Sequence, residues 1–335
     1  MVISAASNTE LVSTIIPVYN RSALLLEAVG SVLAQTYNPI EIVIVDDGST
    51  DDTAAIAESL AASNRDVIRV IRQANAGPGT ARQRGLEQAR GAFIQFLDSD
   101  DLLLPTKFEH QVRALRNQPE CQICYGPSLE EDHSTHPIRR IGPMRATGVP
   151  RRTLFPGLLV ERWWTTSSPL YRRSLLDRIG PWKALINEED WEYDARAGAT
   201  GALLAWVPQE VSVRRIHLAG GHLSDEGCKD PRKLADRALA QTSLYECSRK
   251  AGVPLSSPEM RHFARSAFLL CRQCGEAGVT GAAAALFNLS WNASTPRRRL
   301  APDLLLYRLL AMLIGWEAAA RLSRRLRGRI VRDSV

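Results

Sequence analysis

The 335-residue sequence lacks a long hydrophobic run and a recognisable leader. No uninterrupted apolar segment reaches the ~18 residues that a membrane-spanning helix requires. The first ten residues are polar and contain no basic stretch followed by an apolar run, so no signal peptide is visible. Hydrophobic residues at 45% and charged residues at 23% are ordinary values for a globular protein, which argues against disorder over most of the length.

Cysteine is scarce, with six residues in the chain, but four of them form two C-x-x-C pairs. Cys121 and Cys124 fall in a predicted strand, and Cys271 and Cys274 lie one turn apart in a predicted apolar helix. A structural zinc site needs four ligands that converge, usually from tight turns. Buried free thiols of a cytoplasmic protein therefore explain these cysteines better than a shared zinc ion.

The positive charge is confined to one end of the chain. From Arg297 to Val335 there are ten arginines and three acids, a net charge of +7, so the preceding 296 residues carry −1 of the total of +6. The basic end has no interleaved aromatics over a broad face, and the rest is nearly neutral. These properties argue against a nucleic-acid partner.

Short apolar runs alternate with amphipathic stretches through the first hundred residues. Strands and helices in turn favour an α/β fold with a mostly parallel sheet covered by helices. The predicted strands are Val12–Val18, Ile40–Val45, Val67–Ile71, Ala92–Leu97 and Cys121–Tyr125, and the predicted helices between them are Ser22–Gln35, Thr50–Leu60, Gly79–Gln88 and Pro105–Asn117.

The second half of the chain changes character twice. Gly126–Pro156 is rich in turn formers and mixed charge, which indicates a loop-rich mobile insertion. Short helices that begin at Arg172 and Glu189 precede two predicted strands, Leu203–Val207 and Val211–Ile216. From Asp230 onward the pattern is purely helical. We therefore expect a domain boundary near Lys229 and an all-helical C-terminal extension over 229–335.

Carboxylates follow two of the predicted parallel strands. Asp46-Asp47 ends the second strand, and Asp98-Ser99-Asp100-Asp101 follows the fourth. In open parallel sheets, ligands bind beyond the carboxyl ends of the strands. Clustered carboxylates suit Mg²⁺ or Mn²⁺ bound together with phosphate oxygens. The alternative, an acidic turn that caps the next helix, is weakened because two such clusters at one edge would repel each other unless a cation or hydrogen-bond donors compensate.

These motifs, taken in order, resemble the family 2 glycosyltransferases of GT-A (Rossmann-like) fold. The resemblance rests on Ile16-Pro17-Val18-Tyr19-Asn20, Val45-Asp46-Asp47-Gly48-Ser49-Thr50-Asp51, Asn75-x-Gly77 with Ala81-Arg82, Asp98-Ser99-Asp100-Asp101 and Glu189-Asp190-Trp191. It covers about residues 11–225. It implies a GT-A catalytic domain over 1–228, with a nucleotide-sugar half at about 11–104 and an acceptor half at about 105–228.

The resemblance also implies roles for residues of the donor half. Pro17 and Tyr19 would line the base pocket, and one carboxylate of Asp46-Asp47 would accept a hydrogen bond from a pyrimidine N–H. Arg82 would lie near the nucleoside or diphosphate, and Asp98 near the ribose. Asp100 would coordinate the divalent cation, Mn²⁺ or Mg²⁺, that bridges the phosphates of a nucleotide-sugar donor, most often a UDP-sugar.

The acceptor half supplies the remaining expected site residues. Asp190 matches the base that deprotonates the attacking hydroxyl of a glycan or lipid-linked saccharide in an inverting displacement. Its neighbour Glu189 is expected beside the acceptor, although acids at a helix start also simply complement the helix dipole. Trp163 and Trp164 are expected either against the acceptor sugar or in the core. His217 would help to hold the metal, with His222 as a competitor.

The C-terminal tail, 300–335, has two open interpretations. Its leucine-rich helix followed by arginines would lie on an anionic membrane surface, which would place a cytoplasmic protein on the inner face of the membrane. The same helix would otherwise dock its leucine face on the protein. For the whole chain, the alternative to a metal-dependent glycosyltransferase is a catalytically silent nucleotide-sugar-binding or scaffold protein.

Overall fold

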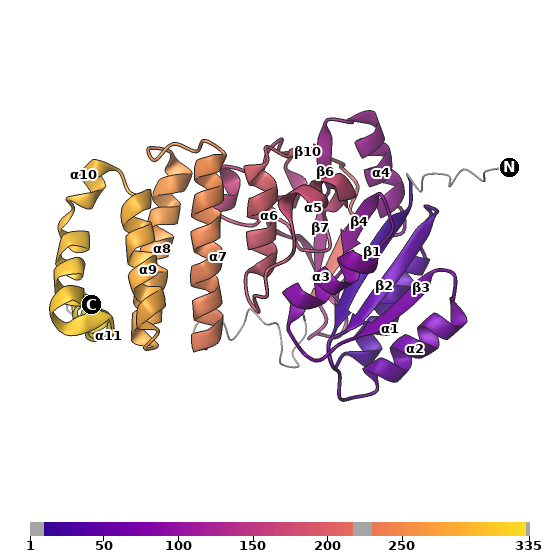
Figure 1. Cartoon of the computed structure of the whole chain (residues 1–335), viewed down its shortest axis with the longest axis horizontal. Coiled ribbons are helices and arrows are strands. Elements are labelled where there is room, and N and C mark those ends of the chain that lie inside the picture. The colour runs from indigo at the N-terminus through magenta and orange to yellow at the C-terminus, as the bar shows by residue number, and fades with distance from the viewer. Residues whose placement is uncertain (1–9, 217–229, 333–335) are drawn as a thin grey trace. The chain divides into compact units, whose positions relative to one another are not determined.

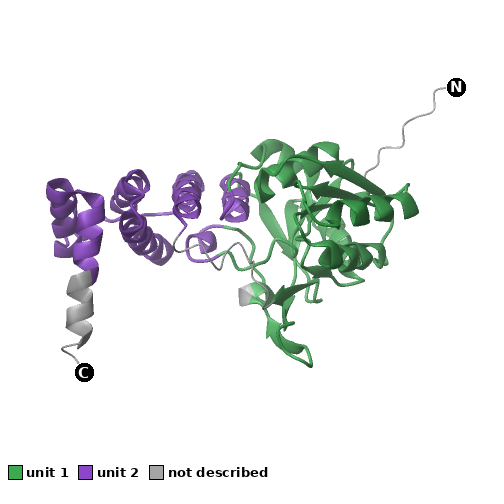
Figure 2. Cartoon of the chain, turned by 90° about the horizontal axis from the view of Figure 1, so that it is seen from below, with its two compact units in different colours: residues 1–154, 162–185, 200–220 green, residues 155–161, 186–199, 221–335 purple. Residues whose placement is uncertain are grey.

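The computed structural model describes residues 10–216 and 230–332, and these divide into two compact units that interleave along the chain (Figure 2). Unit 1 comprises 1–154, 162–185 and 200–220, and unit 2 comprises 155–161, 186–199 and 221–335. Two earlier segments, 155–161 and 186–199, thus group with the helices of unit 2, and the boundary near Lys229 stays a prediction.

Unit 1 is built on a seven-stranded sheet in the order β10-β6-β9-β4-β1-β2-β3. Six strands are parallel, and β9 alone is antiparallel to its neighbours β4 and β6. The strands are β1 (Val12–Val18), β2 (Ile40–Asp46), β3 (Ile68–Arg72), β4 (Phe93–Phe96), β6 (Cys121–Tyr125), β9 (Leu170–Arg172) and β10 (Leu203–Trp206). The predicted α/β class with a mostly parallel sheet is confirmed.

Helices cover both faces of this sheet, as the continuous burial of β1 and β2 requires. Alternate residues such as Val12 and Ile16 join α1 and α4 in one core, while Ile15 faces α3. A Cβ on Gly85 of α3 would lie 2.4 Å from Ile15 Cγ2, so this glycine lets the helix approach the sheet closely. The helices are α1 (Ser22–Leu33), α2 (Thr53–Ser63), α3 (Pro78–Gln88), α4 (Lys107–Asn117) and α5 (Arg173–Ile179).

A second sheet of four strands, in the order β5-β11-β7-β8, also belongs to unit 1. Its strands are β5 (Leu102–Leu103), β7 (Ser128–Asp132), β8 (Arg139–Pro143) and β11 (Ser212–Ile216). A 3₁₀ turn, Arg145–Gly148, follows β8. The predicted loop over 126–156 is therefore wrong in part. The β7–β8 hairpin was missed because β8 is exposed and charged, so it lacks the apolar alternation by which a half-buried strand is recognised.

Unit 2 is helical. It contains a 3₁₀ turn (Gly157–Leu159), α6 (Glu189–Ala199), α7 (Pro231–Lys250), α8 (Pro258–Glu276), α9 (Thr280–Ala293), α10 (Pro296–Arg299) and α11 (Pro302–Arg332). Figure 1 shows these helices standing one after another from α6 to α11. Asp230 accepts a hydrogen bond from Arg232 N at 2.8 Å, and this N-cap begins α7 where the helical pattern was expected to start. Within the described residues, no helix has the length and apolar character needed to cross a bilayer.

Candidate functional site

The two acidic motifs lie on strands that pair with the same neighbour. β2 runs parallel to β1, with Val18 opposite Asp46, and β4 runs parallel to β1 on its other side, with Phe96 opposite Ile15. Asp46-Asp47 and the segment beginning at Asp98 therefore leave the sheet at its carboxyl edge, on either side of the end of β1. The expected meeting of these strand ends is confirmed.

Asp47 fixes the loop that follows β3. Its carboxylate accepts hydrogen bonds from Gln73 Nε2 at 2.7 Å and from the backbone N–H groups of Ala76 and Gly77 at 2.9 Å each. The adjacent Gly48 has φ 79°, and a Cβ there would lie 2.8 Å from Asn75 N. The Asp46-Asp47-Gly48 and Asn75-x-Gly77 motifs thus form one continuous structure at the strand ends.

Asp46 is fully buried and faces a different partner. Its Oδ1 accepts from Ser49 N at 2.9 Å, and its Oδ2 lies 3.2 Å from Arg72 Nε. The loop after β1 is joined to the same turn, because Thr50 N donates to Asn20 Oδ1 at 2.8 Å. Beside this junction the Tyr19 ring is 45% exposed, while Pro17 is buried within β1. Tyr19 is therefore accessible to a ligand, and Pro17 shapes the strand beneath it.

Arg82 and Asp98 form an ion pair at the edge of the sheet. Arg82 Nη2 lies 2.7 Å from Asp98 Oδ1, and the guanidinium stands 5.0 Å from the centre of the Trp182 ring. Arg82 is buried, whereas a third of the Asp98 side chain is exposed. The arrangement holds a positive charge next to a carboxylate that solvent, or a ligand, can reach.

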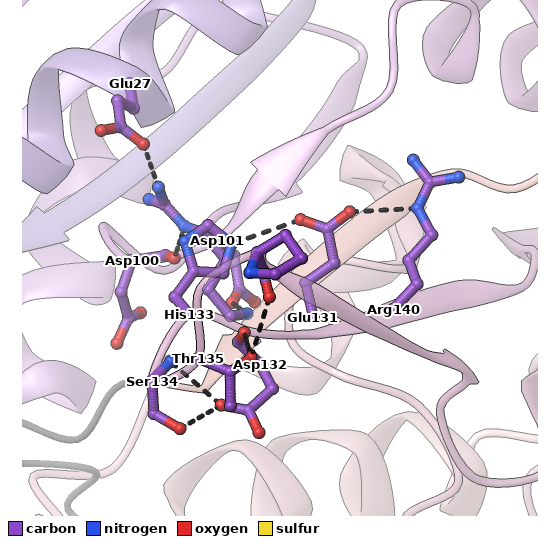
Figure 3. Close-up of polar contacts among 11 residues, drawn as sticks. Glu27, Asp100, Asp101, Glu131, Asp132, His133, Ser134, Thr135 and Arg140 are labelled. Carbon is purple, nitrogen blue, oxygen red and sulfur yellow. Dashed lines mark hydrogen bonds and ion pairs between the residues drawn. The ribbon is translucent and has the colours of Figure 1, made fainter.

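Asp100 contacts two arginines that the sequence did not single out. Its carboxylate pairs with Arg21, and its backbone oxygen accepts from Arg215 Nε. Arg215 is buried and also pairs with Glu27, whose carboxylate lies above Asp100 in Figure 3. A signal for both arginines was present, since Arg21 directly follows the Tyr19-Asn20 motif and Arg215 stands two residues before His217.

Asp101 has a different environment from Asp100 although the two are adjacent. Ser167 Oγ donates to its Oδ2 at 2.8 Å, and Arg215 N lies 3.4 Å from its Oδ1. Burial, together with the charges of Asp100 and Asp98, raises the pKa of Asp101 well above its ordinary value. Asp101 therefore anchors the turn. Asp98, with a third of its side chain exposed, is the carboxylate of this segment that a ligand reaches most readily, while Asp100 is buried against Arg21.

The acids of the neighbouring hairpin are engaged locally. Glu131 lies 3.2 Å from both His133 Nε2 and Arg140 Nε, as Figure 3 shows. Asp132 Oδ1 accepts from Ser134 N at 3.0 Å, and its Oδ2 pairs with Arg139 at 3.3 Å. Glu130, the third carboxylate of β7, pairs with Arg214 of β11 at 2.9 Å, so each β7 acid has a partner within the second sheet or its hairpin.

The donor set suits a hard divalent cation that a substrate also ligates. Asp98 and Asp100 offer carboxylate oxygens, which Mg²⁺ and Mn²⁺ prefer, and such ions take their remaining ligands from phosphates and water. Over 10–216 and 230–332 no group of three or more His, Cys, Asp or Glu side chains is placed to hold a metal by itself. Asp98 and Asp100 are thus the described residues of this segment whose donor chemistry fits a divalent cation.

Comparison with known proteins decides the family. The profile of glycosyl transferase family 2 matches residues 13–180, half of the chain. The chain belongs to glycosyltransferase family 2. An uncharacterised glycosyltransferase of Nostoc sp. is 29% identical over 265 residues, which is 75% of each protein. This family 2 member is thus an enzyme that transfers a glycosyl group, which sets aside the silent scaffold as the alternative.

Solved structures show that the glycosyltransferase has a GT-A-like fold. S. aureus TarS 1–349 in complex with UDP superposes with a TM-score of 0.63 at 19% identity, over 94% of this chain and 91% of that one. The mannosyltransferase PcManGT from Pyrobaculum calidifontis, in complex with GDP-Man and Mn²⁺, gives 0.52 at 18% identity, over 93% and 86%. The GT-A architecture expected from the motifs is confirmed.

The acidic group 188–190 of the glycosyltransferase belongs to unit 2. Glu188 accepts from Arg237 Nε at 2.7 Å and from Gln241 Nε2 at 2.8 Å, so it ties the start of α6 to α7. Glu189 is buried, and Asp190 is partly exposed, with Trp191 N donating to its Oδ1 at 2.7 Å. Glu188 and Asp190 are half-buried, and Glu189 is the buried member of the three acids.

The two expected acceptor tryptophans are fully buried. The ring of Trp164 packs edge to face on Tyr125, with centroids 5.0 Å apart, and the Arg151 guanidinium stands 4.6 Å from the Trp163 ring centre. This environment favours the core interpretation of Trp163 and Trp164 over an acceptor contact. His217 and His222 lie outside the described residues.

Proposed function

We propose that this glycosyltransferase moves a sugar from a nucleoside diphosphate donor to an acceptor hydroxyl with inversion at the anomeric carbon. The observation that supports this proposal is the acidic segment at the sheet edge, where Asp98 pairs with Arg82 and Asp100 pairs with Arg21. Paired carboxylates and arginines in one place suit a dianionic diphosphate that arrives with a divalent cation. UDP is the favoured nucleotide, in line with the TarS complexes with UDP and UDP-GlcNAc.

The donor's nucleoside would bind against the loops after β1 and β2. The exposed Tyr19 ring offers a face for the base, and one carboxylate of Asp46-Asp47 would accept its N–H. The loop 73–77 is already attached to Asp47, so it would close one side of this pocket. Arg82 would hold the diphosphate end while Asp98 accepts from the ribose.

Asp100 is the residue that would hold Mn²⁺ or Mg²⁺, with His217 as a further proposed ligand. When bound, the cation neutralises the charge that develops on the leaving diphosphate. The chain's own Arg21 and Arg82 guanidinium groups would add fixed positive charge at the same place. Arg215 and Asp101 would keep the turn rigid from beneath, because both are buried and joined to it by hydrogen bonds.

Asp190 is proposed as the general base. An acceptor hydroxyl must lose its proton as it attacks, and a carboxylate within hydrogen-bond reach can take that proton. The neighbouring Glu188 holds α6 in place through α7, so the Asp190 backbone is fixed. Glu189 would position the acceptor, which we propose to be a glycan or a lipid-linked saccharide.

A transfer assay tests this proposal. Release of nucleoside diphosphate would be measured for UDP-, dTDP- and GDP-sugars with Mn²⁺, in the wild type and in Asp190→Asn. We expect one donor class to turn over, and Asp190→Asn to lose about 10²–10⁴-fold in kcat with unchanged donor affinity. Asp177→Asn, an exposed acid on α5, is the matched control and should retain full activity. Activity of Asp190→Asn within threefold of wild type would refute the base assignment.

A further inference from the structure

The first half of α11 exposes an apolar stripe. Six large apolar side chains are 41% to 74% exposed. They are Leu305, Leu306, Leu309, Met312, Leu313 and Ile314, and we call them the leucine stripe. Most of them recur at three- and four-residue spacing, so they share one side of the helix. Exposed apolar residues scattered singly are normal, but a contiguous row indicates an interaction surface.

The opposite side of the same helix already has its own core contacts. Leu304, Tyr307 and Ala311 are buried, and the Tyr307 ring lies 5.1 Å from that of Phe268 of α8 and 6.1 Å from that of Phe287 of α9. In Figure 1, α11 closes the row of helices in unit 2, so no later described helix follows to cover its outer side. The helix therefore docks one face on the unit and presents the leucine stripe outward.

Arginines stand on both sides of the leucine stripe. Arg297 and Arg298 of α10 precede it, and Arg321 and Arg324 follow it with side chains 64% and 76% exposed. Within the stripe's span the single charge is Arg308, which lies 5.0 Å from the Trp291 ring centre. Three of these flanking arginines also pair with acids, Arg298 with Asp303, Arg321 with Glu317 and Arg324 with Glu276. In the sequence, four further arginines continue the basic run to Arg332, so the net charge of the flanks stays positive. A short apolar row bracketed by cations matches the interface of an anionic bilayer, with acyl chains below and phosphates around.

A second copy of this chain fits the leucine stripe less well. Because basic residues lie at both ends of the stripe, pairing two copies in either direction would bring arginine against arginine. Anionic lipid headgroups would instead meet a positive charge at both ends. Gly315, with φ 82°, breaks α11 between the leucine half and the arginine half, so the apolar stretch is short and would lie on a bilayer without crossing it.

We propose that the leucine stripe docks this glycosyltransferase on the surface of an anionic membrane. Flotation of the full chain with vesicles tests the proposal. Phosphatidylcholine vesicles are compared with vesicles that also contain phosphatidylglycerol, at low and high salt. We expect binding to the mixed vesicles to exceed binding to neutral ones by about tenfold or more and to weaken with salt.

Variants separate the two parts of the surface. Leu309→Ser with Leu313→Ser should lower binding to anionic vesicles about tenfold or more, because it removes apolar insertion. The matched control is Leu239→Ser with Leu269→Ser, which removes two exposed leucines from α7 and α8 and should leave binding unchanged. Arg297→Gln with Arg324→Gln should weaken binding and reduce its salt dependence. Thermal unfolding should be unaffected in all three.

Two results would overturn the proposal. One is equal recovery of the wild type and the leucine-stripe variant with anionic vesicles. The other is a stable wild-type dimer in sedimentation analysis that becomes a monomer in the leucine-stripe variant, since the stripe would then be a contact between copies. Transfer activity on a water-soluble acceptor is a separate readout, and we expect it to stay unchanged in the leucine-stripe variant.

Discussion

At the residue scale, neighbouring carboxylates of the acidic segment 98–101 have different partners. Asp101 takes a hydrogen bond from Ser167, whereas Asp98 pairs with Arg82 and Asp100 pairs with Arg21. Those partners come from distant parts of the chain, so their contacts follow from the tertiary fold and not from local spacing.

Glu41 offers a residue-scale test of the sheet's buried polar contacts. Its carboxylate is buried in β2 and accepts from Ser13 Oγ at 2.6 Å and from Arg90 N at 2.6 Å. Burial alone would raise the pKa of Glu41, but the hydrogen bonds from Ser13 and Arg90 outweigh it and hold the pKa below 4.5. A carboxyl with a lowered folded-state pKa stabilises the fold above its unfolded pKa, and this contribution is lost as the pH falls through the folded value.

We therefore expect Glu41→Gln to lower the free energy of unfolding by about 1–3 kcal/mol at neutral pH. The difference from wild type should shrink as the pH falls through the lowered pKa of Glu41 in the folded protein, where the wild-type carboxylate takes up a proton. Urea unfolding across this pH range measures both effects. Glu58→Gln, an exposed acid on α2, is the control and should change stability little. A constant difference at every pH would contradict the proposed charge-dependent role of Glu41.

At the element scale, buried strands and amphipathic helices were predicted well, because their apolar periodicity is dictated by one fixed environment. β1 and β6 have the bounds expected from the sequence. The β7–β8 hairpin escaped prediction because its partner strand β11 lies some 80 residues away, and pairing at that range leaves no local signal. Glu188 and Glu192, on either side of the predicted site residues Glu189 and Asp190, accept hydrogen bonds from α7.

The turn after β2 carries a prediction of its own. Gly48 adopts φ 79° and has no room for a Cβ beside Asn75 N, so Gly48→Ala must strain the turn and move the 73–77 loop. We expect a loss of about 1–3 kcal/mol in unfolding free energy and weaker nucleotide binding. Gly281→Ala, in α9 with nothing within 4 Å of the added Cβ, is the matched control and should be neutral or stabilising. Equal stability of the two variants would contradict the close approach.

At the scale of the whole molecule, the sequence predicted an α/β half and a helical half but not how they interleave. Segments 155–161 and 186–199 belong to unit 2 although unit 1 surrounds them in the chain. Composition cannot reveal this, since α6 is amphipathic like the helices of unit 1. What assigns it to unit 2 is packing on α7, where Ser243 Oγ donates to buried Glu192 at 2.8 Å.

The buried cysteines report on the integrity of both units. Burial raises the pKa of Cys124 in unit 1 and of Cys271 in unit 2 to about 12. Thiolate is the reactive form, so these thiols should be inert in the native protein. In a Cys228→Ser background, we expect thiol reagents to react at least ~100-fold more slowly before unfolding than after it. Rapid native-state labelling would contradict the burial of the five described cysteines.

The most direct measurement is calorimetric binding of UDP, with GDP and dTDP in parallel, to wild type and Asp100→Asn with Mn²⁺ or with chelator. We expect one nucleotide to bind the wild type with Mn²⁺, and its affinity to fall about tenfold or more in the chelator and in Asp100→Asn. Asp66→Asn, an exposed acid before β3, is the control and should bind like wild type. If the affinity in chelator and the affinity of Asp100→Asn both equal that of the wild type with Mn²⁺, a cation-assisted diphosphate site at this edge of the sheet is contradicted.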